Sequence, residues 1–267
     1  MIWQTKHETP YVVSYIKYDL TPETQKQTTA AGGDVFATTR WTVVLAAGRP
    51  QAPQADVALE ELCRTYWYPL YVYVRRQTAT REDAEDLTQA FFARLLEKNY
   101  LEGISSTGGK FRAFLLVAVK RFLANEWDRA NRQKRGGGVA PLSLDWQDAD
   151  TRYQINPADN VSPDKLYDRA WAVTLLERVI TRLRDENSAD GKARIYAQLQ
   201  PFLMVGKDEI SYSHAAATLQ LSEGAVRVTV HRMRRRYREL LREEIAQTLS
   251  DPAQADEEMQ VLFSALT

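Results

Sequence analysis

The stretch SYSHAAATLQLSEGAVRVTVHRMRRRYREL, residues 211–240, predicts two helices joined by a short turn. The apolar residues of its second half recur at steps of four and three: Val226, Val230, Met233, Tyr237 and Leu240. This is the period of an amphipathic helix and a strand cannot use it, although AVRVTV taken alone alternates as a strand would. We therefore expect a long helix over about residues 223–247.

The residues before this helix complete a helix-turn-helix pattern. A short helix is expected over about residues 212–219, with Ala216 at a position of close contact. Gln220 lies where such turns often place glycine, whose backbone tolerates a positive φ, and Ser222 is suited to cap the second helix. Two helices joined by so short a turn pack at a steep angle, and in DNA-binding proteins the second one lies in the major groove.

Arginine is concentrated on the outer side of the expected long helix. Six arginines lie between Arg227 and Arg238, whereas the whole chain balances 35 basic against 35 acidic residues. We expect Arg227, His231 and Arg232 to reach bases or phosphates of duplex DNA. A solvated basic helix and a helix that binds an acidic protein are the alternatives, and the capped turn favours DNA.

The composition argues against several classes of protein. Cys63 is the only cysteine, so neither a disulfide framework nor a cysteine-based zinc site is expected. The three histidines are scattered and match no metal-ligand spacing. The sequence contains no apolar run of about 18 residues and no recognisable signal peptide, so we expect a cytoplasmic protein without metal or cofactor.

The chain as a whole is typical of the all-α class, with two helical domains joined by a flexible linker. Helical periodicity recurs in both halves, and a stretch rich in Gly, Pro, Asp and Asn separates them. The expected regions are a poorly ordered extension (1–33), a helical domain (34–135), the linker (136–163), a helix-turn-helix domain (164–248) and an acidic tail (249–267).

Further helices are expected on either side of the linker. In the first of them, over 57–76, Pro69 predicts a kink or a fresh helix start, and its segment YPLYVYV alone would also suit a strand. The others are 80–98, capped by Thr80 with Asp83 at the capping-box position, 110–135, ended by Gly136, 162–186, capped by Ser162, and a weaker one over 190–204.

The segment EDAEDLTQAFF, residues 82–92, crowds four carboxylates at one helix start. One interpretation is an acid/base pair made of Glu82 and Asp86. Another is that the carboxylates only cap and solvate the helix, where they favour its dipole. A third is a protein-docking face made of Glu82, Asp86 and Gln89.

Basic and aromatic residues are interleaved along the expected helix over 110–135. This combination suits single-stranded DNA, in which bases stack on rings and cations hold phosphates. Trp127 is the candidate for stacking. We assign Phe111, Phe114 and Phe122 to the core instead.

Two parts of the sequence resemble bacterial sigma factors. YPLYVYVRR, REDAEDLTQAFFARLL and GGKFRAFLLVAVKRFLANEWDR are similar to the second conserved region of these proteins, and residues 211–240 are similar to their fourth region. The other regions are absent, which points to the extracytoplasmic-function (ECF) group. The resemblance implies a promoter-specificity subunit of RNA polymerase with no catalysis of its own, which binds core polymerase and promoter DNA, with an anti-sigma partner left open.

The resemblance also implies a role for each cluster. The loop Ser105–Lys110 and the following helix would capture a flipped base of the melted minus-ten element, and the linker would thread toward the polymerase active-site channel. The implied minus-ten residues are Lys110, Arg112, Lys120, Arg121, Trp127 and Arg129. The implied minus-thirty-five residues are Ser222, Arg227, His231, Arg232 and Arg235. Asp83, Asp86 and Gln89 would dock on the clamp coiled coil of the large polymerase subunit.

Three other functions stay open at this point. The first is a stand-alone helix-turn-helix regulator of duplex DNA, the second an enzyme that uses the Glu82–Asp86 carboxylates, and the third an interaction protein with an acidic partner. We also hypothesise that the acidic tail regulates the protein by offering its acid to the chain's own basic helix.

Overall fold

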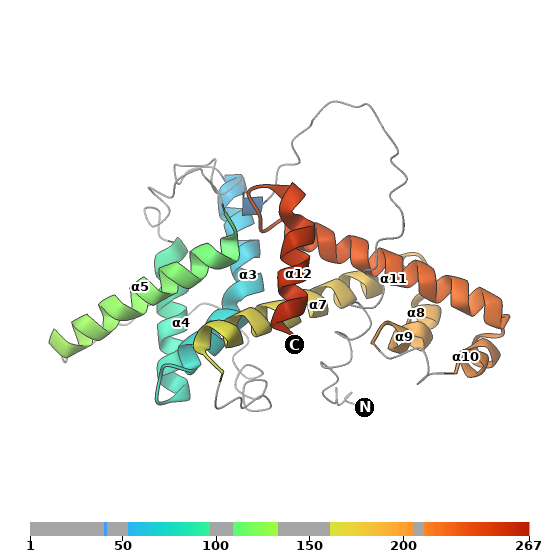
Figure 1. Ribbon diagram of the computed structural model, residues 1–267, viewed down its shortest axis with the longest axis horizontal. Coiled ribbons are helices and arrows are strands. Elements are labelled where there is room, and N and C mark those ends of the chain that lie inside the picture. The colour runs from blue at the N-terminus through green and yellow to red at the C-terminus, as the bar shows by residue number, and fades with distance from the viewer. Residues whose placement is uncertain (1–39, 42–52, 97–108, 133–160, 205–210, 267) are drawn as a thin grey trace, which may run out of the picture. The chain divides into compact units, whose positions relative to one another are not determined.

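The structure of the protein, a computed structural model, describes residues 40–41, 53–96, 109–132, 161–204 and 211–266 (Figure 1). These residues form helices and one isolated β-bridge, with no strand among them, so the expected all-α class is confirmed. The chain divides into two compact units. We call them the α3–α5 unit (Ala37–Thr174 with Ile245–Ala265) and the α10–α11 unit (Leu175–Glu244).

The α3–α5 unit is built around three helices. They are α3 (Pro53–Arg75), α4 (Arg81–Leu96) and α5 (Phe111–Arg132). The segment YPLYVYV is helical, and Pro69 lies inside α3 without ending it. Every residue of this segment is buried, because α3 is covered on several sides and so has no need of a polar face.

Local capping fixes where the helices of this unit begin. The Asp83 amide donates to Thr80 Oγ1 over 3.1 Å, as the expected N-cap requires. The Thr80 hydroxyl in turn donates to the Asp83 carboxylate over 2.6 Å. α7 (Pro163–Ala189) begins with Pro163 directly after Ser162, whose Oγ accepts from the Lys165 amide over 3.4 Å.

Aromatic rings fill the centre of the α3–α5 unit. Trp41 is 1% exposed, and its ring lies 4.8 Å from that of Phe111 and 5.4 Å from that of Phe114 between centroids. Tyr66 meets Phe111 edge to face at 5.1 Å. Phe111 and Phe122 are buried, as expected, and Phe114 is half-buried. Aromatic rings of this size each bury a large apolar area, so this cluster is a main part of the core of the unit.

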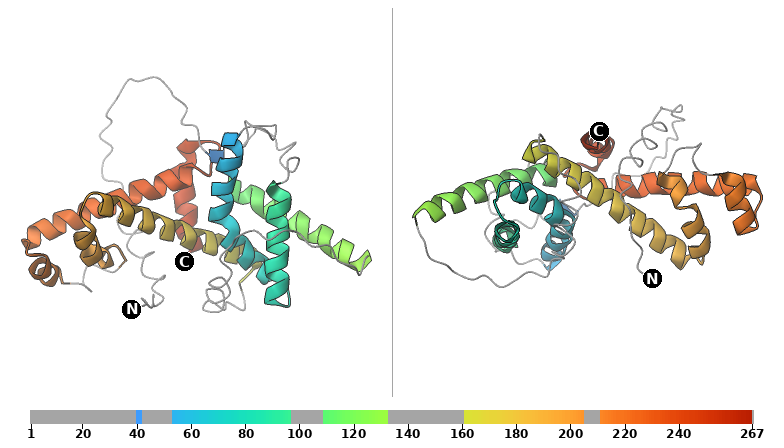
Figure 2. Two further views of the ribbon diagram at one scale, coloured as in Figure 1. Left: turned by 180° about the vertical axis from the view of Figure 1, so that it is seen from behind. Right: turned by 90° about the horizontal axis from the view of Figure 1, so that it is seen from below.

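The C-terminal segment folds into this same unit. It forms a short 3-10 helix (Pro252–Gln254) and α12 (Ala255–Ala265). One face of α12 is buried: Ala255, Glu258, Met259, Leu262 and Phe263. Figures 1 and 2 show α12, in dark red, beside the first half of α7. We expected an acidic tail here and no helix, so α12 is an element that the sequence patterns did not reveal.

The α10–α11 unit consists of the second part of α7 and four more helices. These are α8 (Ala193–Leu199), α9 (Pro201–Met204), α10 (Tyr212–Leu219) and α11 (Glu223–Ala246). Figure 2 shows α8, α9 and α10 gathered beside the N-terminal part of α11. The predicted apolar face of α11 is buried at each of its five positions.

The division into units differs from the expected domain limits. Its boundary falls inside α7, after Thr174, and the segment Ile245–Ala265 belongs with the α3–α5 unit. The expected linker lies almost wholly outside the described residues, and so does the N-terminal extension. A single long helix thus contributes its two halves to two different cores.

Candidate nucleic-acid interface

The turn between α10 and α11 has the geometry of a helix-turn-helix. Gln220 adopts φ 57° and ψ 41°, and its amide donates to the carbonyls of Ala216 and Ala217. It is the one non-glycine residue with positive φ in the described part of the chain. A left-handed residue here ends α10 and reverses the chain, as the position of Gln220 in the sequence suggested.

Side-chain caps hold both helices at this turn. Ser211 Oγ accepts from the His214 amide over 3.3 Å at the start of α10. Ser222 Oγ accepts from the Ala225 amide over 3.2 Å at the start of α11. Ser222 is therefore the N-cap of α11, and its hydrogen bond stabilises the first turn of that helix.

The outer face of α11 presents polar side chains to solvent. Arg227, His231, Arg232 and Arg235 are exposed along it. Arg227, His231 and Arg235 follow one another at steps of four, and Arg232 lies three residues before Arg235, so the four share one broad side of the helix. With Ser222, these are the residues that the sequence placed against duplex DNA. The structure brings them together on one surface.

Arg227 is held in one orientation. Its guanidinium lies 4.3 Å from the centroid of the Tyr212 ring, and it donates to Glu223 Oε1 over 2.6 and 3.1 Å. Tyr212 itself packs on Phe202. An arginine fixed between an aromatic face and a carboxylate loses less rotamer freedom when it binds a base edge.

Two half-buried arginines of the same basic stretch contact other helices of their unit. Arg234 donates to the Phe202 carbonyl over 2.8 and 3.3 Å. Arg236 makes paired hydrogen bonds to the Glu186 carboxylate over 2.8 and 2.9 Å. Their sequence context is the same as that of Arg232 and Arg235, so only packing separates the structural arginines from the exposed ones.

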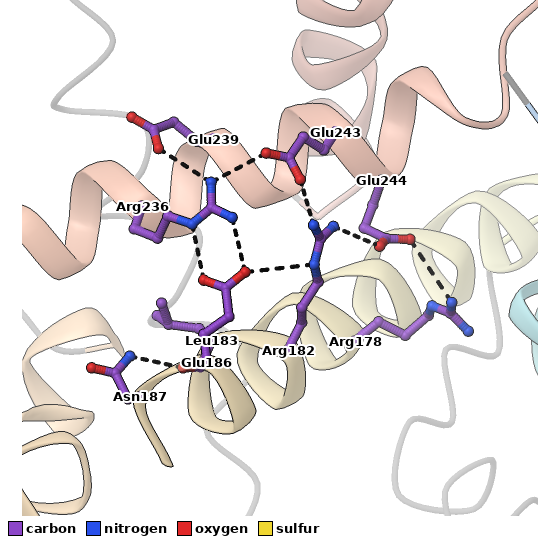
Figure 3. A network of polar contacts seen from close by, with 9 residues as sticks. All are labelled: Arg178, Arg182, Leu183, Glu186, Asn187, Arg236, Glu239, Glu243 and Glu244. Carbon is purple, nitrogen blue, oxygen red and sulfur yellow. Dashed lines mark hydrogen bonds and ion pairs between the residues drawn. The ribbon is translucent and has the colours of Figure 1, made fainter. Parts of the chain in front are cut away.

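Arg236 belongs to a network that joins α7 to α11 (Figure 3). Its Nη1 also contacts Glu239 at 3.3 Å and Glu243 at 3.2 Å, while Arg182 binds Glu243 at 2.6 Å and Glu244 at 3.1 Å. The hydrogen bonds from Arg236 lower the pKa of Glu186, and those to Glu186 raise the pKa of Arg236.

The residues expected to bind single-stranded DNA spread along α5. Toward its C-terminal end Arg121, Trp127 and Arg129 are exposed, and Trp127 is 43% exposed. Arg129 pairs with Glu126 over 2.8 Å. Lys120 is also exposed and binds Asp164 over 2.6 Å. An exposed tryptophan among cations is the arrangement that single-strand stacking needs.

The first turn of α5 is different, because its cations already have acidic partners. Lys110 binds Glu258 over 2.5 Å. Arg112, only 13% exposed, binds Glu258 over 3.0 Å, pairs with Asp168, and covers the Trp171 ring at 4.6 Å. Burial lowers the pKa of Arg112, but the charges of Glu258 and Asp168 more than offset this, so its pKa lies above the ordinary value.

The acidic residues expected to dock on polymerase lie along α4. Asp83 and Asp86 are exposed and Gln89 is half-buried. Asp83 is engaged in the cap with Thr80, whereas Asp86 has no ion-pair partner among the described residues. Glu82 is exposed as well, so the Glu82–Asp86 pair has no buried environment in which to work as an acid and base.

Three further observations bear on the expected functions. Of the expected base-capturing loop Ser105–Lys110, only Gly109 and Lys110 fall within the described residues. In the described part of the chain, no cluster of three or more His, Cys, Asp or Glu residues could hold a metal ion. None of the helices described is long and apolar enough to cross a membrane.

Comparison with known proteins adds one match. A family model described as ECF sigma factor matches residues 55–243, well over half of the 267-residue chain. The match runs from α3 to α11 and so includes α4, α5 and the helix-turn-helix. No curated protein and no solved structure matches the chain significantly.

Proposed function

Since the chain belongs to the ECF sigma factor family, we propose that it recognises promoters through the outer face of α11 and opens them through α5. Promoter recognition for transcription initiation by RNA polymerase, without catalysis, is the function of the family. The observation that carries the assignment of surfaces is the capped helix-turn-helix, whose second helix exposes four polar side chains on one side.

Duplex recognition is assigned to the minus-thirty-five element. Arg232 and Arg235 are exposed and could reach a base or a phosphate, Arg235 after release from its 3.3 Å contact with Glu239. Arg227 is pre-oriented by Tyr212 and Glu223. Arginine that binds two acceptors of guanine is the commonest specific contact in the major groove. His231 lies between these arginines on the exposed side, and the Ser222 cap sets the start of α11.

Strand opening is assigned to α5. Trp127 offers a ring for a base of the minus-ten element, and Lys120, Arg121 and Arg129 offer cations for the backbone. Lys110 and Arg112 complete the set, because they lie where α5 begins. Binding of an unpaired base favours the open strand, so melting needs no nucleotide hydrolysis.

Polymerase docking is assigned to α4, with Asp86 as its centre and Asp83 and Gln89 beside it. An exposed carboxylate without an ion-pair partner is available to a basic surface on another protein. The clamp coiled coil of the large polymerase subunit is the docking site proposed. The protein then works in the cytoplasm beside polymerase, and an anti-sigma factor that covers α4 or α11 would control it.

The test is co-elution with bacterial core RNA polymerase on a sizing column. We expect a one-to-one complex that Asp86→Ala weakens. Glu257→Ala, which removes an exposed carboxylate from α12, is the matched control and should leave the complex intact. If the folded chain formed no complex, the helix-turn-helix would still bind duplex DNA, and a stand-alone regulator would become the better description.

A further inference from the structure

We propose that the C-terminal segment, residues 247–265, is a built-in competitor of single-stranded DNA for the first turn of α5. The segment pairs with this turn and neutralises its cations, so the DNA strand and the segment cannot occupy it together. This inference rests on the proposed role of α5 and adds regulation to that site. It also gives the acidic tail a different target from the basic helix that the sequence suggested.

Main-chain hydrogen bonds attach the segment to the start of α5. The Phe111 amide donates to the Thr248 carbonyl over 3.0 Å, and the Ser250 amide donates to the Gly109 carbonyl over 3.3 Å. They flank an antiparallel bridge between Lys110 and Leu249. The Gly109 amide donates in addition to Ser250 Oγ over 3.0 Å. The C-terminal segment therefore takes up the main-chain groups just before and at the start of α5.

Charge on α12 is placed against the same junction. Glu258 is 1% exposed, and its carboxylate contacts both Lys110 and Arg112. A carboxylate this deeply buried is stable only beside cations. A phosphate of the DNA backbone would therefore have to displace Glu258 in order to reach Arg112, and it would compete with Glu258 for Lys110, whose side chain is 31% exposed.

Other residues of α12 keep the segment docked on the α3–α5 unit and oppose the binding of DNA. Met259, Leu262 and Phe263 hold it by burying apolar surface. Asp256 and Glu257 are exposed on its outer side, so the docked helix presents negative charge where a phosphate backbone would run. The docked α12 thus opposes binding of a DNA strand in two ways: it occupies the basic side chains, and its negative charge repels the phosphates.

The remainder of the single-strand surface stays open. Arg121 and Trp127, on the later turns of α5, are exposed although α12 is docked at the start of that helix. The segment therefore masks one end of the site and leaves the other accessible. A strand first held at Trp127 would gain Lys110 and Arg112 only when α12 leaves.

Glu258→Gln is the variant that tests the mask, because it removes the charge and keeps the shape. Binding of a fluorescein-labelled single-stranded DNA of mixed sequence to the full-length chain is measured by anisotropy. A masked state that holds about nine-tenths of the molecules lowers apparent affinity about tenfold, so we expect Glu258→Gln to bind up to about tenfold more tightly. Glu257→Gln makes the same change in net charge at an exposed position, so it relieves some repulsion of the DNA but releases neither cation, and its gain in affinity should be much smaller than that of Glu258→Gln.

The salt dependence separates unmasking from a general change in fold. Each cation that newly contacts a phosphate of a single strand steepens the plot of log K against log salt by about 0.7. With Lys110 and Arg112 released, the slope for Glu258→Gln should be steeper by about 1.4 than for wild type. Equal affinity and equal slope in the two proteins would overturn the proposal.

A second measurement needs no variant. Hydrogen–deuterium exchange of the wild-type chain, with and without saturating single-stranded DNA, should show faster exchange over residues 255–265 when DNA is bound. Unchanged exchange there with DNA bound to α5 would refute displacement. If no DNA binds to wild type or to Glu258→Gln, the inference falls, and co-elution with core polymerase decides separately whether the proposed function falls with it.

Discussion

Arg236 lies within the basic stretch of α11, yet the structure predicts that it stabilises the fold and does not bind DNA. We expect Arg236→Ala to lower the free energy of unfolding by about 1–2 kcal/mol. An exposed ion pair contributes about 0–1 kcal/mol, and the Arg236 side chain is 36% exposed, so solvent screens each contact. Arg236 makes paired contacts with Glu186 and further bonds to Glu239 and Glu243. The loss of all of them together should therefore exceed the loss of one exposed ion pair.

Urea unfolding followed by far-UV circular dichroism measures this change. A double-mutant cycle with Glu186→Ala should return a coupling energy of about 0.5–1 kcal/mol, because the two side chains touch directly. Additive effects would show that Arg236 acts through its other carboxylates or through packing of its stem alone.

The pH dependence gives an independent check on the same pair. The pKa of Glu186 is lowered below its ordinary value of 4.5. The unfolded chain therefore binds this proton first, so the stabilisation is complete above about pH 4.5 and is lost as pH falls through the lowered pKa. The difference in stability between wild type and Arg236→Ala should shrink over that range.

Arg232→Ala is the matched control on the same helix. Its side chain is exposed, so its effect on stability should stay within about 0.5 kcal/mol, while promoter binding weakens by about 1–3 kcal/mol. Arg236→Ala should show the reverse pattern. The assignment of Arg236 to the fold would be refuted by one result: Arg236→Ala keeps the wild-type free energy of unfolding but loses as much promoter affinity as Arg232→Ala.

Three more changes test other parts of the structure. Gln220→Gly should leave stability unchanged or raise it by up to about 1 kcal/mol in urea unfolding, because relief of left-handed strain is partly offset by glycine's chain entropy; a loss above 1 kcal/mol would contradict the turn geometry. Trp127→Ala should weaken polymerase-bound complexes with pre-melted promoter DNA by about 1–3 kcal/mol, and equal affinity would remove Trp127 from the site. Leu262→Ala, at a fully buried position, should cost about 1 kcal/mol in thermal unfolding, because the loss of packing stops at the free energy that favours the docked state of α12; no measurable loss would mean that α12 does not pack on the core.

Local patterns in the sequence were enough to predict the helices before the C-terminal segment and the starts of α4, α7 and α11. Ser222 caps α11 and Thr80 caps α4 through hydrogen bonds that span three residues. The apolar period of α11 predicted its buried face, because side chains three and four positions apart share one side of a helix. The turn at Gln220 was predictable for the same reason, since its geometry depends on adjacent residues. Family resemblance then predicted a role in promoter recognition, and the family match confirmed that function.

Tertiary structure alone decided which charged residues face inward. Glu186 lies 50 residues from Arg236, and Glu258 lies 146 residues from Arg112, so no local period could reveal either pair. The same separation hid the packing of α12, whose buried carboxylate looks in sequence like one more acid in a solvated tail. An arginine beside a helix core and an arginine beside water have the same sequence signature, and the difference between them is which distant carboxylate the fold brings within hydrogen-bonding distance.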